Sequence, residues 1–364
     1  MLEVAFITDA PRVAGSEIWL LERLPRLASL GLRPTLFLPQ RPNLDGFAEV
    51  LEGKGVRVRR YARLGEVLEA TAPYALRVFQ GWRETTYYLL FPRLARPKVA
   101  VVHEQLDYRY PAGLRQTYHL LYRLGKGSAL KGADRVLTVS WWAARFLRGL
   151  GLEAEAVPNG VDPDRFRPAD PEERVHLRRA YGLRRFTVLV PGRFAPEKNQ
   201  LAALFTARRV PEMDFLFAGD DDSPLGALSR GLKRTLGLEN VRFLGRREDM
   251  PELYRAADAV LLPTLGENQS LATLEAMASA LPVVTTPIPA QEELIQNGVT
   301  GLLVPPRPHL LAQALWALAR DPHLAQALGQ AARRKVLAHH TLEESIKRLA
   351  RVLQEVRYAC ASTA

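Results

Sequence analysis

The chain has 364 residues, a hydrophobic content of 47% and a formal net charge of +11. This length exceeds one ordinary core and predicts two domains of about 150 to 200 residues each. A single cysteine, Cys360, excludes an intrachain disulfide and a multi-cysteine metal site.

Strand and helix patterns alternate in the first part of the chain. Apolar runs predict strands at residues 3–8, 34–38, 56–61, 76–79, 98–103, 133–140 and 154–157, and helices at 46–54 and 141–150. This order is typical of a doubly wound parallel sheet. No basic leader precedes the first strand and no apolar run reaches membrane-spanning length, so we expect a cytoplasmic protein without a secretion signal.

Two positions in this part are candidates for ligand contact. Gly15 and Ser16 lie in the turn between the first strand and an amphipathic helix ending near Leu30, where a backbone without a Cβ and free amides can approach a ligand. An ordinary strand-to-helix turn fits the same residues. His103 ends a strand, where such sheets present ligand groups, although a lone histidine is more often structural.

The positive charge is concentrated in one segment. Residues 93–148 hold 11 basic and 3 acidic residues, and within 108–132 five basic residues stand beside four tyrosines and no acid. A helix lying at an anionic membrane surface fits this pattern, and so does an amphipathic helix that covers the sheet with a solvated outer face. The segment has no recognisable nucleic-acid-binding motif, so we expect no nucleic-acid partner.

A turn-rich stretch, residues 158–163, predicts a domain boundary. We therefore expect an N-terminal domain over 1–162, a second domain over 163–343, and a C-terminal helix over 344–364 that packs back on the first domain. The second domain has its own strand patterns at 186–191, 215–218, 241–244, 259–263, 282–285 and 301–304. The predicted fold class is α/β, with two Rossmann-like parallel-sheet domains facing a cleft.

The most informative stretch of the second domain surrounds a helix start. Ser270 is a predicted N-cap, which leaves the amides of residues 271–273 free, and such a terminus binds anions, most often phosphate. Glu267 precedes the helix and Glu275 lies about one turn inside it, so each carboxylate can accept hydrogen bonds from ligand hydroxyls. This arrangement favours a hydroxylated phosphate ester such as a nucleotide sugar.

Arg193 and Lys198 follow another strand, in the sequence Gly192-Arg-Phe-Ala-Pro-Glu-Lys-Asn199. Two cations five positions apart on one loop can both reach a diphosphate, the arginine as a fork and the lysine as a point charge. A surface loop of ion pairs is the alternative interpretation.

Taken in order, these motifs resemble the GT-B-fold retaining glycosyltransferases of family 4. The resemblance is carried by Gly15-Ser16-Glu17, His103-Glu104, Thr138-Val139-Ser140, Val157 to Asp162, Gly192 to Asn199, the pair Glu267 and Glu275, and Asn297 to Val304. It implies that Arg193 and Lys198 hold the diphosphate of a nucleotide-sugar donor, that Glu275 binds the ribose, and that Glu267 and His103 lie at the donor sugar. It further implies transfer with retention and without a metal or cofactor.

The resemblance assigns the candidate site residues as follows. Catalytic roles fall to His103, Glu267, Arg193 and Lys198, and donor binding to Gly15, Ser16, Gly192, Arg193, Lys198, Glu267, Asn268, Gln269, Ser270, Leu271 and Glu275. Asn268-Gln269-Ser270 departs from the family pattern, and its amides could contact particular sugar hydroxyls. The acceptor is expected to be a sugar, a lipid-linked group or a glycan, with the protein peripheral at the inner face of a membrane as one option.

Two alternatives keep the fold but change the activity. One is a sugar-nucleotide epimerase or phosphorylase, since these enzymes share this architecture. The other is a non-catalytic GT-B domain that binds a partner or glycan. The joint presence of the two glutamates, Arg193, Lys198 and His103 speaks against a domain that only binds.

Overall fold

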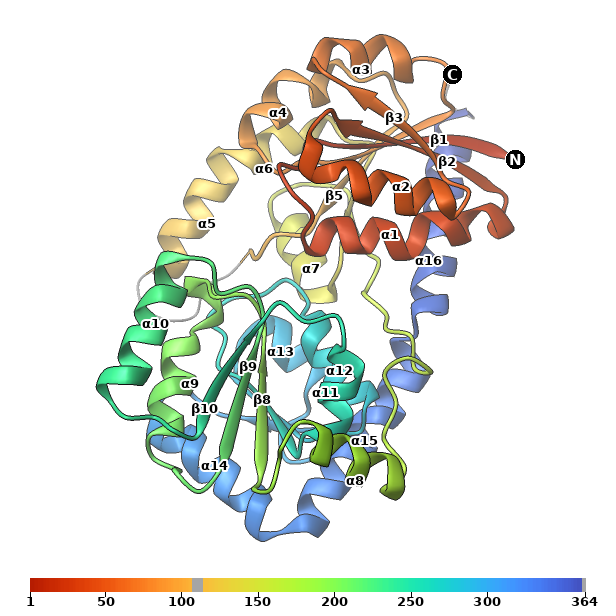
Figure 1. Ribbon diagram of the computed structural model, residues 1–364. Helices are drawn as coiled ribbons and strands as arrows, with labels where there is room; N and C mark the ends of the chain where they lie inside the picture. The colour runs from red at the N-terminus through yellow and green to blue at the C-terminus, as the bar shows by residue number, and fades with distance from the viewer. Residues whose placement is uncertain (107–113, 362–364) are drawn as a thin grey trace. The chain divides into compact units, whose positions relative to one another are not determined.

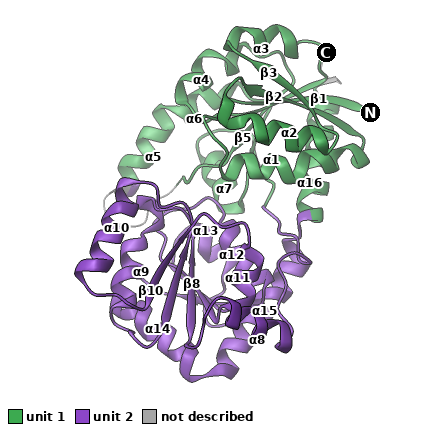
Figure 2. Ribbon diagram, viewed as in Figure 1, with its two compact units in different colours: residues 1–106, 116–158, 343–364 green, residues 107–115, 159–342 purple. Residues whose placement is uncertain are grey.

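The computed structural model describes residues 1–106 and 114–361, which form two compact units (Figure 2). Unit 1 comprises residues 1–106, 116–158 and 343–364, and unit 2 comprises residues 107–115 and 159–342. The division falls after residue 158, inside the turn-rich stretch. Residues 107–113 of the basic segment predicted to meet a membrane or cover the sheet lie outside the described residues.

Unit 1 is built on a parallel sheet whose seven described strands have the order β3-β2-β1-β4-β5-β6-β7. These strands are β1 (Leu2–Thr8), β2 (Leu32–Pro39), β3 (Arg57–Tyr61), β4 (Leu76–Gln80), β5 (Lys98–Val102), β6 (Arg135–Thr138) and β7 (Ala154–Ala156). The strand order reverses direction at β1, which lies beside β2 on one side (Figure 1) and pairs with β4 on the other. Ligands of open α/β sheets bind at the carboxyl ends of the strands beside such a reversal.

The helices that follow these strands along the chain are α1 (Gly15–Leu27), α2 (Asp45–Gly53), α3 (Leu64–Thr71), α4 (Glu84–Leu89), α5 (Leu114–Leu124), α6 (Lys126–Ala129), α7 (Trp141–Gly149) and, from the C-terminus, α16 (Leu342–Ala361). Helix α1 buries Trp19, Leu20 and Leu24 against the unit. The fully buried guanidinium of Arg23 donates to Ser345 Oγ at 3.0 Å, which joins α16 to α1.

Unit 2 contains a second parallel sheet, and its six described strands have the order β10-β9-β8-β11-β12-β13. They are β8 (Thr187–Pro191), β9 (Asp214–Ala218), β10 (Val241–Gly245), β11 (Ala259–Leu262), β12 (Val283–Thr285) and β13 (Leu302–Leu303). The helices of this unit are α8 (Pro171–Ala180), α9 (Gln200–Ala207), α10 (Pro224–Thr235), α11 (Met250–Ala256), α12 (Leu271–Ala278), α13 (Pro289–Leu294), α14 (Pro308–Arg320) and α15 (Pro322–His339).

Two apolar clusters cover the two faces of this second sheet. One cluster joins strand residues to α11, α12 and α15, and the other joins strand residues to α9 and α14. Because both faces are covered, the central strands β8, β11 and β12 are buried throughout, whereas the edge strands β10 and β13 are half-buried. The predicted fold class of two parallel-sheet α/β domains is confirmed. In residues 1–106 and 114–361, no helix has the length and apolar content needed to cross a membrane.

Candidate active site

The predicted phosphate-binding residues of unit 2 lie on two loops that leave neighbouring strands. Strand β8 pairs with β11, and each is followed at its carboxyl end by one of these loops. The loop after β8 carries Arg193 and continues into a short 3-10 helix, Pro196–Lys198, while the loop after β11 carries Glu267 and leads into α12. The topology therefore places residues about 70 positions apart at one edge of the sheet.

Backbone contacts hold the two loops together. Thr264 Oγ1 and the Leu265 amide donate to the Glu197 carbonyl oxygen at 2.8 and 2.7 Å. Asn199 has φ 53° and ψ 42°, a left-handed conformation that asparagine tolerates, and its Nδ2 donates to the Pro263 carbonyl oxygen at 3.0 Å. These bonds fix the spacing of the side chains between the loops.

Glycine is required where the loop after β8 passes close to the start of the segment after β9. Gly192 has φ +131°, and a Cβ placed on Gly219, which follows β9, would lie 2.1 Å from the Gly192 carbonyl oxygen. Any side chain at residue 219 would therefore push the loop that carries Arg193 out of place. Gly192, predicted as a donor-binding residue, lies at this close approach.

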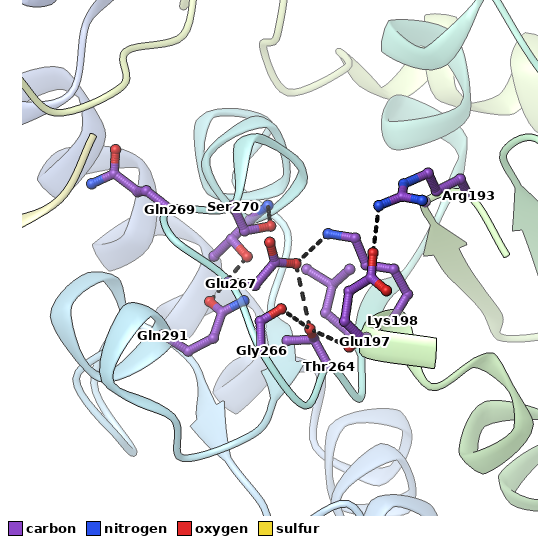
Figure 3. A network of polar contacts seen from close by, with 12 residues as sticks. Arg193, Glu197, Lys198, Thr264, Gly266, Glu267, Gln269, Ser270 and Gln291 are labelled. Carbon is purple, nitrogen blue, oxygen red and sulfur yellow. Dashed lines mark hydrogen bonds and ion pairs between the residues drawn. The ribbon is translucent and has the colours of Figure 1, made fainter. Parts of the chain in front are cut away.

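Each of the two cations is paired with a carboxylate (Figure 3). Arg193 Nη2 lies 2.5 Å from Glu197 Oε1, and Lys198 Nζ donates to Glu267 Oε1. The arginine and lysine side chains are 52% and 23% exposed, whereas both carboxylates are 11% exposed. The cations thus lie on the solvent side of their partners, where a phosphate can reach them. The structure brings Arg193, Lys198 and Glu267 together, but it also shows a partner, Glu197, that the sequence analysis did not single out.

Helix α12 begins as predicted, with one correction. Ser270 Oγ accepts a hydrogen bond from the Thr273 amide at 3.2 Å, which confirms Ser270 as the N-cap. The prediction that the Thr273 amide is free is therefore wrong, because this amide donates its hydrogen bond to the capping hydroxyl. The amides of Leu271 and Ala272 keep no partner within the described residues. An anion at this terminus would therefore meet two backbone donors and the positive end of the helix dipole.

Glu275 lies inside α12, and a buried tyrosine orients its carboxylate. Tyr254 on α11 is fully buried, and its hydroxyl donates to Glu275 Oε2 at 2.9 Å. Burial, together with the charge of Glu275, holds the pKa of the Tyr254 hydroxyl well above its usual value, so it stays a donor. The sequence analysis missed Tyr254, which follows no recognisable motif.

The polar insert before α12 is more structural than the sequence suggested. Gln269 is buried, and its Oε1 accepts a hydrogen bond from the Asn159 amide at 2.5 Å while Asn159 Nδ2 donates to the Gln269 carbonyl oxygen at 3.3 Å. Gln269 therefore ties the loop before α12 to the turn that begins unit 2. Asn268 is also buried. The two amides predicted to contact sugar hydroxyls are thus largely enclosed by protein.

A buried carboxylate organises the Gly15 turn in unit 1. Glu17 is fully buried and accepts hydrogen bonds from Ser16 Oγ at 2.8 Å, from the Ala14 amide at 3.2 Å and from Trp82 Nε1 at 3.2 Å. Burial raises the pKa of the Glu17 carboxyl, and these donors partly offset that effect. The turn is therefore held from inside the unit, with Gly15 at the start of α1.

His103 directly follows β5 and joins the same turn through a glutamine. Its Nε2 lies 3.1 Å from Gln80 Oε1, and Gln80 Nε2 donates to the Ser16 carbonyl oxygen at 3.3 Å. The ring packs edge-on against Trp19 with 5.1 Å between centroids. Burial, and then the charges of Arg23 and Lys126, lower the pKa of His103 to about 3. A neutral ring that donates from Nε2 leaves Nδ1 as an acceptor.

Comparison with known proteins identifies the family. Residues 13–165 match the family described as glycosyltransferase family 4, and residues 185–321 match glycosyl transferases group 1. A GDP-mannose-dependent alpha-(1-6)-phosphatidylinositol monomannoside mannosyltransferase of Mycobacterium tuberculosis is 30% identical over 97% of this chain and 98% of its own length. The chain belongs to glycosyltransferase family 4. This glycosyltransferase has other relatives that it matches over a shorter length.

A UDP-Gal:alpha-D-GlcNAc-diphosphoundecaprenol alpha-1,3-galactosyltransferase of Escherichia coli is 30% identical over 56% of each chain. A D-inositol 3-phosphate glycosyltransferase of Kribbella flavida is 33% identical over 57% of this chain and 54% of that protein. The glycosyltransferase is also similar to Anabaena Alr3699/HepE, solved in complex with UDP and glucose, with a TM-score of 0.84 at 20% identity over 98% of this chain and 100% of that one. This structural likeness shows the GT-B fold.

Proposed function

We propose that this glycosyltransferase moves a sugar from a nucleotide-diphosphate sugar to an acceptor hydroxyl, with retention of anomeric configuration and without a metal ion. The observation that carries the proposal is the pair of cations, Arg193 and Lys198, held by carboxylates beside the start of α12. The M. tuberculosis and E. coli relatives, named for GDP-mannose and UDP-Gal, support a nucleotide-sugar donor.

The chemistry follows from the charge that develops on the leaving diphosphate. As the bond from the anomeric carbon to the diphosphate breaks, negative charge grows on the phosphate oxygens. Arg193, Lys198 and the amides of Leu271 and Ala272 offer donors for that charge, and the fixed loops mean that little reorganisation is needed during the reaction. These cations supply the positive charge that a metal ion supplies in other sites, which is our reason for proposing metal independence.

Glu267 and Glu275 would serve the neutral parts of the donor. The carboxylate of Glu275, which Tyr254 orients, would accept hydrogen bonds from ribose hydroxyls, and Glu267 would accept one from a hydroxyl of the sugar. When a diphosphate attracts Lys198, the Glu267 carboxylate loses a partner that a sugar hydroxyl can replace. Retention is proposed from the family resemblance, with the leaving phosphate taking the proton of the attacking hydroxyl.

We further propose an acceptor that carries phosphate and lies at an anionic membrane surface. The names of the three relatives above include phosphatidylinositol monomannoside, a diphosphoundecaprenol and inositol 3-phosphate, which supports the phosphate. The membrane proposal is supported by helix α5, on which Leu120, Leu121 and Leu124 are 56%, 64% and 67% exposed. Residues 120, 121 and 124 lie on one face of a helix, as in helices that rest on a lipid surface.

Vesicle sedimentation tests the membrane proposal. Changing Leu120, Leu121 and Leu124 together to serine should reduce binding to anionic vesicles at least tenfold. The matched control changes three exposed apolar residues of unit 2, Val175, Leu228 and Leu337, to serine and should bind as the wild type does. Equal binding of both triple variants, or no vesicle binding by the wild type, would contradict the proposal.

A screen of nucleotide sugars by thermal shift tests the donor. A donor that binds the folded protein raises the melting temperature in proportion to the logarithm of its concentration over its dissociation constant. Transfer is then measured as nucleoside diphosphate released with and without an acceptor. A different nucleotide sugar formed without any acceptor and without net release of nucleoside diphosphate would point to an epimerase, and binding without product would point to a non-catalytic domain.

A further inference from the structure

A polar pocket of 360 Å³ lies within unit 1, at the carboxyl ends of the neighbouring strands β3, β2, β1 and β4. Its lining comes from the last residues of β2 and β3 and from the segments that follow the four strands: Asp9, Pro39, Gln40, Arg41, Tyr61, Ala62, Leu64, Arg83 and Thr86. This is the point at which the strand order reverses at β1, where open α/β sheets bind ligands. The volume falls in the range of small-molecule sites.

Two arginines of the pocket have no anionic partner. The guanidinium groups of Arg41 and Arg83 make no ion pair or hydrogen bond within residues 1–106 and 114–361. Arg60 nearby shows the contrast, because it pairs with Asp45 at 2.8 Å and donates to the Pro39 and Arg41 carbonyl oxygens. The cations that the pocket presents are therefore available to a ligand, whereas the neighbouring one is occupied.

The carboxylate of Asp9, the acidic residue of the pocket, already accepts hydrogen bonds from protein donors. The Asp9 carboxylate accepts from the amides of Trp82 and Arg83, the latter at 3.2 Å, and from Thr86 Oγ1 at 2.6 Å. Asp9 therefore fixes the segment that carries Arg83, and these donors offset its charge. With two arginines against one aspartate, the lining keeps a net charge of +1.

The tyrosine in the pocket adds no negative charge. The Tyr61 hydroxyl donates to the Thr8 carbonyl oxygen at 2.8 Å. Burial, and then the charge of Asp9, raise the pKa of this hydroxyl far above its usual value, while Arg41 and Arg83 act in the opposite direction. Arg41 and Arg83 line the same pocket as Tyr61.

We propose that this pocket is the subsite for a phosphate group of the acceptor, bound by Arg41 and Arg83. The inference rests on the proposed function, since it assigns the second substrate of the same reaction. Planar guanidinium groups bind two phosphate oxygens at once, and two of them from different loops fix the orientation of the group. In the proposed function the donor diphosphate binds Arg193 and Lys198 of unit 2, so Arg41 and Arg83 serve a different phosphate.

Isothermal titration calorimetry with inorganic phosphate tests the subsite. We use the Lys198→Ala variant as the reference protein, so that binding at the proposed donor site is weakened. Adding Arg41→Ala and Arg83→Ala should raise the dissociation constant for phosphate at least tenfold. Adding Arg59→Ala instead should leave the dissociation constant for phosphate within twofold. Arg59 is exposed on β3 outside the pocket, and the loss of Arg59 changes the net charge by the same amount per residue.

Two results would overturn the assignment: no phosphate binding by the Lys198→Ala protein, or the same binding after both pocket arginines are removed. With an acceptor that the wild type uses, the Arg41→Ala and Arg83→Ala double variant should raise the acceptor KM at least tenfold and leave the donor KM within twofold. An unchanged acceptor KM would also overturn it. Failure of the proposed function appears separately, as a wild type that binds phosphate through these arginines but binds no nucleotide sugar.

Discussion

Replacing Lys198 by alanine removes one cation from the proposed diphosphate site. In the structure Lys198 Nζ contacts Glu267 Oε1, and with a donor bound it would contact a phosphate oxygen. A hydrogen bond between charged groups contributes about 2 to 3 kcal/mol where it is partly shielded from water. At 1.4 kcal/mol per factor of ten, kcat/KM for the donor should fall about 30-fold to 150-fold.

The assay measures kcat/KM with the donor found by the thermal-shift screen, together with the melting temperature of each protein. Lys347→Ala is the matched control, because Lys347 also pairs with a glutamate, Glu343, but on the exposed surface of α16. The control should keep both its stability and its activity, because an exposed ion pair adds little to stability. If Lys198→Ala keeps kcat/KM within twofold while folded, the diphosphate site is wrongly placed.

Three further predictions concern the groups around the site. Ser270→Ala should lower the free energy of unfolding by about 1 kcal/mol and raise the donor KM, whereas Asp170→Ala, which removes the N-cap of α8, should lower stability similarly with the donor KM unchanged; a donor KM of Ser270→Ala equal to that of the wild type would refute a role for the α12 terminus. Tyr254→Phe should raise the dissociation constant for the free nucleoside diphosphate several-fold by releasing Glu275, measured by binding titration, and unchanged affinity would count against it. Because the pKa of His103 is lowered to about 3, the ring should stay neutral from pH 8 down to pH 5, and a ring that titrates near 6.5 in NMR spectra would contradict the described burial.

Much of the fold could be predicted because parallel sheets leave a strong sequence signal. Strands buried on both faces read as short apolar runs, and the segments predicted at 186–191 and 259–263 became β8 (Thr187–Pro191) and β11 (Ala259–Leu262). The cap at Ser270 was predictable for a similar reason, since a hydroxyl directly before an apolar helix is a local pattern. Such features depend only on residues close together in the sequence.

The contacts that complete the candidate site depend on topology, which one sequence does not reveal. Glu267 meets Lys198 across 69 positions because β8 and β11 are neighbours in the sheet, and Tyr254 meets Glu275 because α11 packs beside α12. Gln269 was predicted to contact sugar hydroxyls from its polarity alone, but its amide oxygen accepts from a backbone amide 110 positions away. Polarity predicts hydrogen bonding and leaves the partner open.

The pocket of unit 1 is a second example. Arg41 and Arg83 stand in different loops, 42 positions apart, and neither belongs to a motif. The order β3-β2-β1-β4 brings their loops to one edge, and the pairing of Arg60 with Asp45 distinguishes the occupied arginine from the available ones. The sequence predicted a basic protein, but the structure was needed to show which cations lack a partner.

The most direct test of the account is the anomeric configuration of the product formed from an α-linked nucleotide sugar. The reaction is run with the donor from the screen, and the first product is examined by proton NMR before it can equilibrate. Retaining, metal-independent transfer gives an α-linked product, nucleoside diphosphate released in equal amount, and unchanged turnover after treatment with a metal chelator. A β-linked product, or no transfer from any nucleotide sugar, would contradict it.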